Sequence, residues 1–211
     1  MTLEELSVEF DILFNNISSD QAPGLTEYEK SVFLTQAQEA IILDLYKGTL
    51  GDSFETTEEV TRYLSSLVTT YTVSKLSSLE ALLNTKETKI NLPEDLMFIT
   101  YQSANINGRD VLVTPTTQDS LFNILNNPFK GPNKNRIISV SEEGKILLYS
   151  KDDISKYYLK YLKHPYPIIL NNSEFSVRGK QDSKEITWLP EILHIQILLR
   201  AVQIAKSVWT S

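Results

Sequence analysis

Apolar residues in the first third of the chain recur every three or four positions, which is the spacing of one face of an α-helix. Three such runs each begin with a threonine that is followed three residues later by a glutamate, the capping-box pattern of a helix N-terminus. The pattern predicts three amphipathic helices that form a small bundle or layer. The three pairs are Thr2 and Glu5, Thr26 and Glu29, and Thr56 and Glu59.

Residues that end helices separate these runs. Pro23 and Gly24 stop the first helix, and Gly48 suits the position just after the second. Residues 71–91 are rich in Ser, Thr and Lys, and we expect them to cross from the helices to a sheet. The apolar stripes are Leu3, Leu6, Phe10, Leu13 and Ile17; Phe33, Ala37, Ile41 and Leu45, widened by Leu34 and Ile42; and Val60, Leu64, Leu67, Val68 and Tyr71.

The middle of the chain alternates short apolar runs with turn residues, which is typical of antiparallel strands. Asn107 and Gly108 lie between two of these runs and form the strongest short hairpin signal in the sequence. A second hairpin turn ends at Gly144, and residues 119–125 suit a short helix. The expected strands are 97–106, 109–115, 136–141, 145–150 and, with a helix left open as the alternative, the tyrosine-rich 154–163.

The end of the chain has a broad apolar face at helical spacing. Pro190 suits the first position of a helix. A helix this apolar has to be buried, either in its own core or against a partner. Its apolar positions are Ile192, Leu193, Ile197, Leu198, Ala201, Ile204, Ala205 and Val208.

Together these elements predict one α+β domain over residues 1–211. Amphipathic helices are expected in 1–72, a mainly antiparallel, barrel-like sheet in 73–188 and a long helix in 189–209. No strand–helix–strand alternation runs through the chain, which argues against a doubly wound parallel fold. A chain of 211 residues is long enough to bury a sizeable core without disulfides or metals.

Charge is distributed unevenly along the chain. Residues 1–60 hold 13 acidic and two basic side chains, whereas residues 61–211 hold 14 acidic and 18 basic ones, and the net charge is −7. Solvated helix faces explain such a split. A polarised subunit that packs head to tail against its own copies explains it as well. A net negative charge also argues against a dedicated nucleic-acid-binding protein.

The residues on which catalysis and metal binding usually depend are scarce. The chain has no cysteine, which excludes disulfides, thiolate catalysis and thiolate metal sites, and its two histidines are His164 and His194. We expect His164 to serve in a turn before Pro165 and His194 to pack in the last helix. No phosphate-binding glycine motif, serine-hydrolase elbow or paired-histidine zinc motif occurs. We therefore predict that the protein is not an enzyme and needs no cofactor or metal.

The chain also lacks the signals of membrane insertion and export. No apolar run approaches the roughly 20 residues that cross a bilayer. The acidic start of the chain, MTLEELSVEF, has neither the basic nor the apolar region of a signal peptide. We expect the protein to be made in a cytoplasm and kept there, or carried in a particle assembled there, without membrane contact.

Lysine and tyrosine alternate near the end of the predicted sheet, which has two interpretations. Basic and aromatic residues together can bind nucleic acid through phosphate contacts and base stacking. The same run fits a half-buried strand, because its two faces would carry different residues. One face would hold Lys156, Tyr158 and Lys160, and the other Tyr157, Leu159 and Tyr161.

Two places suit contact with another protein. Residues 126–136 form a loop with Gly and Pro in which Phe129 lies among basic side chains, either as an ordinary surface loop or with Phe129 anchored in a neighbour and the basic groups at the rim. Trp209, near the end of the sequence, either packs on its own domain or anchors in a partner. The candidate interface residues are Phe129, Lys130, Asn133, Lys134, Arg136 and Trp209.

Four segments of the chain carry a resemblance to a known group of proteins. They are QAPGLTEYEKSVFLTQAQE at 21–39, NNPFKGPNKNR at 126–136, YLKHPYPIIL at 161–170 and LPEILHIQILLRAVQIA at 189–205. With these segments the chain resembles virion structural proteins of gut Bacteroidales phages, including crAss-like podoviruses. The resemblance covers nearly the whole chain and is greatest to the ring or adaptor protein beneath the portal in the head–tail connector.

The resemblance implies a ring, expected to be a dodecamer that matches the portal, with the portal protein and neighbouring tail ring proteins as partners. Genomic DNA would pass through the lumen without sequence-specific binding, and a net negative wall suits that passage. The location implied is the head–tail interface of a virion assembled in the host cytoplasm. A lower tail or neck ring of the same virion and a non-catalytic protein-binding module are the alternatives.

Overall fold

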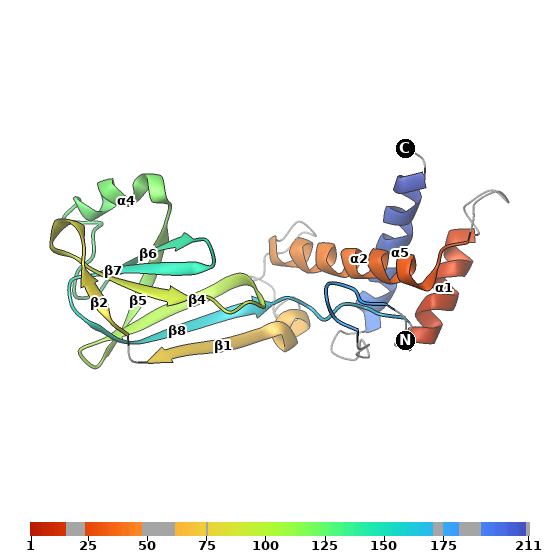
Figure 1. Ribbon diagram of the computed structural model, residues 1–211, viewed down its shortest axis with the longest axis horizontal. Coiled ribbons are helices and arrows are strands. Elements are labelled where there is room, and N and C mark those ends of the chain that lie inside the picture. The colour runs from red at the N-terminus through yellow and green to blue at the C-terminus, as the bar shows by residue number, and fades with distance from the viewer. Residues whose placement is uncertain (16–23, 48–61, 75, 171–174, 182–190, 210–211) are drawn as a thin grey trace. The chain divides into compact units, whose positions relative to one another are not determined.

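The computed structural model describes residues 1–15, 24–47, 62–74, 76–170, 175–181 and 191–209 (Figure 1). The chain divides into two compact units. The helical unit is built from both ends of the chain, Met1–Leu67 and Pro165–Ser211, and the sheet unit is Val68–His164. The expected α+β class is confirmed. Whether the two units fold as the single domain expected over 1–211 stays a prediction.

The helical unit contains the long helices. Both of its first two helices begin at predicted capping boxes. The Thr2 N–H donates to Glu5 Oε2 at 2.8 Å, and the Glu5 N–H donates to Thr2 Oγ1 at 3.1 Å. The same pair of bonds joins Thr26 and Glu29 at 2.8 and 3.3 Å. The N–H and the hydroxyl of Thr26 both donate to Glu29 Oε2 at 2.8 Å and hold the pKa of Glu29 below its usual range. The helices are α1 (Leu3–Asn15), α2 (Glu27–Lys47) and α5 (Glu191–Trp209).

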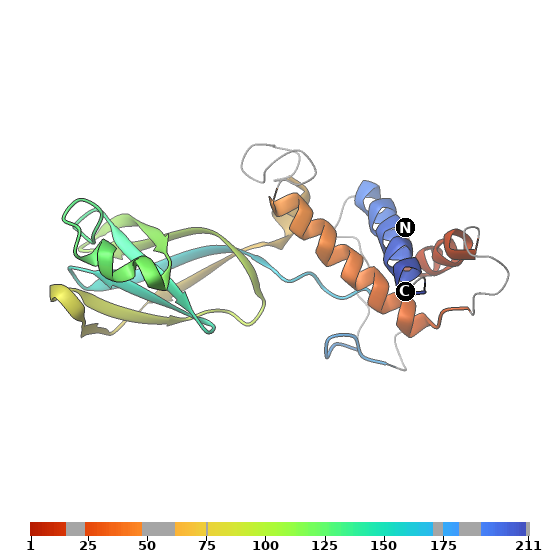
Figure 2. The ribbon, with the colours of Figure 1, turned by 90° about the horizontal axis from the view of Figure 1, so that it is seen from above.

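Helix α5 packs against α2 and α1, so the last helix of the chain completes the core that the first two begin (Figures 1 and 2). Each fully buried large aliphatic side chain stabilises such a core by roughly 1.5–3 kcal/mol. Some predicted core positions of these helices differ from expectation: Leu3, Leu13, Phe33 and Ile204 are only half-buried, and Val208, in the last turn of α5, is exposed. The buried residues are Leu6, Phe10 and Phe14; Leu34, Ala37, Ile41, Ile42 and Leu45; and Leu193, Ile197, Leu198, Ala201, Val202 and Ala205.

Buried hydroxyl groups on α2 bind the extended segment that follows the sheet unit. The N–H of Ile168 donates to Thr35 Oγ1 at 3.1 Å, and the N–H of Leu170 donates to Ser31 Oγ at 3.1 Å. These bonds satisfy backbone groups that have no strand partner. Gln38, three residues beyond Thr35, is fully buried, and neither atom of its amide has a hydrogen-bond partner in the described parts of the chain.

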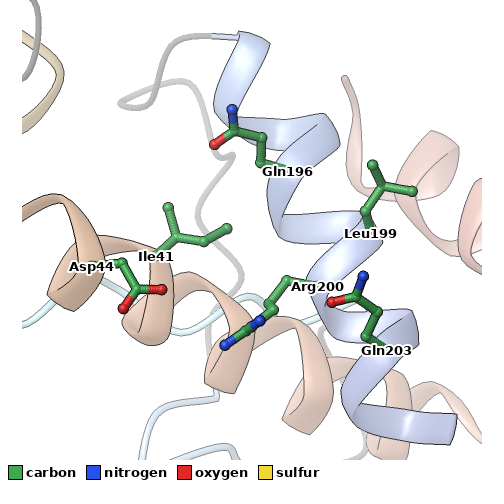
Figure 3. A pocket seen from close by; sticks show the side chains of 6 residues that line it. All are labelled: Ile41, Asp44, Gln196, Leu199, Arg200 and Gln203. Atoms are coloured by element: carbon green, nitrogen blue, oxygen red, sulfur yellow. The ribbon is translucent and has the colours of Figure 1, made fainter. Parts of the chain in front are cut away.

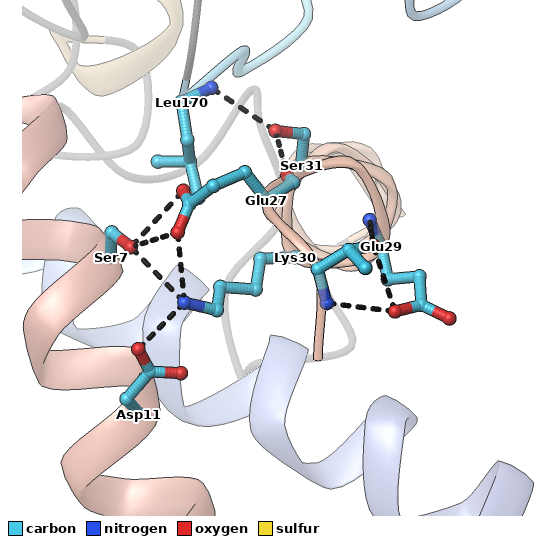
Figure 4. Close-up of polar contacts among 8 residues, drawn as sticks. Ser7, Asp11, Glu27, Glu29, Lys30, Ser31 and Leu170 are labelled. Atoms are coloured by element: carbon cyan, nitrogen blue, oxygen red, sulfur yellow. Dashed lines mark hydrogen bonds and ion pairs between the residues drawn. The ribbon is translucent and has the colours of Figure 1, made fainter. Parts of the chain in front are cut away.

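A buried lysine links α1 to α2 (Figure 4). Lys30 Nζ lies 2.6 Å from Asp11 Oδ2, 3.0 Å from Glu27 Oε1 and 3.2 Å from Ser7 Oγ, and its side chain is 4% exposed. Burial alone would lower the pKa of Lys30, but the two carboxylates outweigh it and raise the pKa above the usual value. The lysine is therefore held in its charged form between the two helices.

The sheet unit is one curled sheet of eight strands in the order β1-β8-β4-β5-β6-β7-β3-β2 (Figure 1). The chain enters through β1 and leaves through β8, and these strands pair, with Val68 opposite Leu162. Entry and exit therefore lie side by side. The strands are β1 (Val68–Ser74), β2 (Ser78–Glu80), β3 (Lys86–Asn91), β4 (Leu96–Ile106), β5 (Arg109–Thr116), β6 (Ile137–Glu142), β7 (Lys145–Ser150) and β8 (Ile154–Lys163).

The predicted hairpins and the tyrosine-rich strand are confirmed. Asn107 and Gly108 join β4 to β5 with φ of 50° and 81°, the left-handed pair that a two-residue hairpin turn requires. Tyr157 and Tyr161 of β8 point into the core, where their hydroxyls donate to Gln102 Oε1 at 3.0 Å and to Asp95 Oδ1 at 2.9 Å. The alternation of β8 is thus that of a half-buried strand.

One pair of strands is parallel, which the sequence analysis did not predict. Strands β5 and β6 pair in parallel, and α4 (Gln118–Leu125), the predicted short helix, lies in the connection between them. One face of β6 and β7 lines the interior of the curled sheet, and the other packs with Leu121 and Leu125 of α4. Burial on both faces explains why these two strands are nearly continuous apolar runs.

The third predicted helix is wrong in its second half. Residues 62–67 form helical turns, the last of them a short 3-10 turn, but Val68 and Tyr71 belong to strand β1. Strand β1 is rich in Val and Thr, whose branched side chains favour a strand. The sheet also ends earlier than the expected residue 188, at Lys163. The predicted residues Ile17, Pro23, Gly48, Thr56, Glu59, Val60 and Pro190 lie outside the described ranges.

Replacing Lys30 with methionine should lower the free energy of unfolding at pH 7 by roughly 1–3 kcal/mol, because two carboxylates lose their charged hydrogen-bond donor. The pKa of Lys30 is raised in the folded protein, so its stabilisation is complete below about pH 10.4, the ordinary lysine value, and is lost as the pH rises through the folded value. Urea titrations from pH 7 to 11 check this. Lys47→Met, at an exposed site on the same helix, is the control, and equal losses for both variants would contradict the account.

Candidate assembly surfaces

The loop of residues 126–136, between α4 and β6, is held in one shape by its own polar groups. Asn127 Oδ1 accepts the N–H of Phe129 at 2.9 Å and of Lys130 at 3.1 Å. The carbonyl of Asn127 accepts the N–H of Gly131 at 2.7 Å. A Cβ on Gly131 would lie 2.8 Å from that carbonyl oxygen, so the turn requires glycine there. The loop is therefore an ordered surface.

This loop presents an aromatic side chain to solvent. Phe129 is 85% exposed, and Lys130 and Lys134 beside it are exposed as well. A side chain on a preordered loop loses little additional freedom when a partner covers it, which favours binding. Phe129, Lys130 and Lys134 are therefore exposed as a contact loop requires, and their contact with a partner stays a prediction.

Two other predicted interface residues serve the shape of the loop. The Arg136 guanidinium donates to the Phe129 carbonyl at 2.8 Å. Asn133 and Arg136 exchange backbone hydrogen bonds of 3.0 and 3.2 Å, and Asn133 Oδ1 accepts the N–H of Asn135 at 2.8 Å. Arg136 is thus not simply a rim charge like Lys130. The backbone of Trp209 ends α5, its side chain lies outside what the structure describes, and its contact role stays a prediction.

A second surface is a shallow groove between α2 and α5, which the sequence analysis missed (Figure 3). Its volume is about 230 Å³. Leu199, which lines it, is 48% exposed, and Ile195, one turn earlier on α5, is 54% exposed. Both lie off the predicted apolar face of α5. Their spacing of four residues places them next to each other on the helix surface, and this spacing could have revealed the exposed apolar pair in the sequence. The lining residues are Ile41, Asp44, Gln196, Leu199, Arg200 and Gln203.

The residues considered for catalysis take structural positions. His194 is 4% exposed within α5, and His164 is exposed at the turn after β8, where its N–H donates to the Asp95 carbonyl at 2.7 Å. Within the described ranges, no group of three or more His, Asp or Glu side chains is placed to hold a metal ion. No helix in the same ranges is long and apolar enough to span a membrane.

Comparison with known proteins gives a family of phage ring proteins, and each match covers nearly the whole chain. The model of a family described as phage tail ring protein 3/4 matches residues 1–210. A protein named Ring protein 3 from Bacteroides phage crAss001 is 38% identical over 219 residues, which cover 97% of this chain and 95% of that protein. Ring protein 4/5 of the same phage is 31% identical over 224 residues, covering 99% of this chain and 94% of the relative.

Replacing Asn127 with alanine should loosen the loop, because two backbone N–H groups lose their acceptor. The amides of Phe129 and Lys130 should then exchange with solvent at least about tenfold faster, on the order of the 1.4 kcal/mol that one side-chain hydrogen bond contributes. Hydrogen exchange followed by NMR measures this. The control is Asn123→Ala, on the exposed face of α4. Unchanged exchange at both amides would contradict the account.

Proposed function

Because the chain belongs to the phage tail ring protein 3/4 family, we propose that it is a structural subunit that joins copies of itself into a closed ring within a phage tail. The observation that carries this proposal is the match over nearly the full length of both the chain and its relatives, since no part of the chain is left for an unrelated activity. The protein acts by assembly and carries out no reaction.

The position of the ring in the virion is the finer part of the proposal. The sequence analysis favoured the adaptor directly beneath the portal, with a lower tail ring as the alternative. The family description refers to a tail ring, which favours the lower position, and both relatives are named ring proteins. In either position the ring surrounds the path of the genome, and its subunits contact the ring above and the ring below.

A closed ring needs heterologous contacts, in which one surface of a subunit fits a different surface of the next. Phe129 on its ordered loop suits the central anchor of such a contact. Lys130 and Lys134 suit its charged rim, opposite the acidic N-terminal part of a neighbouring copy. Arg136 also holds the loop in shape, because one nitrogen of its guanidinium donates to the Phe129 carbonyl, and its remaining donors suit the same rim.

Native mass spectrometry of the purified protein, alone and mixed with the portal and ring proteins of the same phage, tests the proposal. We expect a single closed stoichiometry, a dodecamer if the ring matches the portal. Binding to another ring protein without binding to the portal would place it lower in the tail, and binding to the portal would establish the adaptor position. A monomer under every condition would contradict ring assembly.

The double substitution Lys130→Glu and Lys134→Glu should weaken assembly by at least about tenfold at low salt, because it turns rim attraction into repulsion. The loss should shrink as salt screens the charges. Sedimentation velocity at two salt concentrations measures it. Lys151→Glu with Lys156→Glu makes the same charge change at exposed sites outside the loop. Equal effects of the two double variants would argue against a specific contact.

A further inference from the structure

Helix α1 is apolar on two opposite sides. Leu6 and Phe10 point into the core of the helical unit. On the other side Val8 is 58% exposed and Ile12 is 52% exposed, and a spacing of four residues places them next to each other on the helix surface. We call this pair the α1 strip. The pair offers an apolar surface that a partner could cover.

The flanks of the α1 strip are acidic. Helix α1 holds four acidic residues and no basic one. Asp11 is bound by Lys30, and Glu5 is bound in its capping box. Glu9 is exposed and borders the strip on the flank toward Glu5, whereas the exposed Glu4, one turn before Val8, and Asn15 border the other flank.

The groove between α2 and α5 has the matching properties (Figure 3). Leu199 lines it together with Asp44 of α2 and Arg200, whose side chain reaches from α5 toward α2. The groove has a volume of about 230 Å³, which leaves space for aliphatic side chains such as those of Val8 and Ile12.

We propose that the α1 strip of one copy of this chain docks into the α2–α5 groove of a second copy. The apolar side chains of Val8 and Ile12 pack in the groove against Leu199, and Glu9 pairs with Arg200. The two surfaces differ and belong to the same chain, so the contact is heterologous and can be repeated around a ring. This inference rests on the proposed ring assembly and names a contact within it.

Single substitutions test the apolar part. Ile12→Ser and Leu199→Ser should each raise the protein concentration needed for half-assembly at least about tenfold, as expected for losing one buried aliphatic contact. Val208→Ser is the matched control, because Val208 is 60% exposed on α5 and does not line the groove. Sedimentation velocity gives the assembly midpoint, and circular dichroism verifies that each variant is folded.

Exchanging the charges of Glu9 and Arg200 tests which residues face each other in the contact. Recovery of assembly in the double variant is informative even where a single variant folds poorly. Glu9→Arg and Arg200→Glu should each weaken assembly, and the double variant should return to within about threefold of the wild-type midpoint. If the wild-type protein forms rings and Ile12→Ser, Leu199→Ser and the single charge reversals assemble equally well, this contact is overturned and the proposed ring function stands. A wild-type protein that never forms rings would overturn both.

Discussion

The burial of α5 against α2 and α1 is the interaction on which the rest of this structure depends. It joins the two ends of the chain into one core, and the sheet unit is inserted between these ends in the sequence. The sheet unit meets this constraint because it begins and ends on paired strands, with Val68 opposite Leu162. Ser31 and Thr35 then bind the returning segment to α2, and Lys30 ties α1 to the same helix.

A core built this way leaves each unit with a surface of its own. The sheet unit carries Phe129 on a loop that Asn127 and Arg136 hold in shape. The helical unit carries the α2–α5 groove and, on α1, the strip of Val8 and Ile12. A subunit that has to contact two neighbours in a ring needs separate, unlike surfaces. Membership of the phage tail ring protein 3/4 family is the reason why we propose these surfaces as contacts within a ring.

The sequence predicted what is determined locally. Capping boxes marked α1 and α2, the Asn107–Gly108 pair marked a hairpin, and the resemblance to crAss-like phage ring proteins is confirmed. What it missed depends on contacts far apart in the chain: the pairing of β1 with β8, the parallel pair β5 and β6, and the groove formed with α2. Val68 and Tyr71 were assigned to a helix because their spacing fits one, although the Val- and Thr-rich run around them favours the strand that they form.

The central claim is that this chain works by closing into a ring through unlike surfaces of its copies. Electron cryomicroscopy of the assembled protein tests it most directly, because it shows the symmetry and the contacting surfaces together. The account predicts closed rings of one cyclic symmetry in which every copy contacts its two neighbours through two different surfaces. Two-fold dimers joined by the same surface, or particles no larger than one chain, would contradict it.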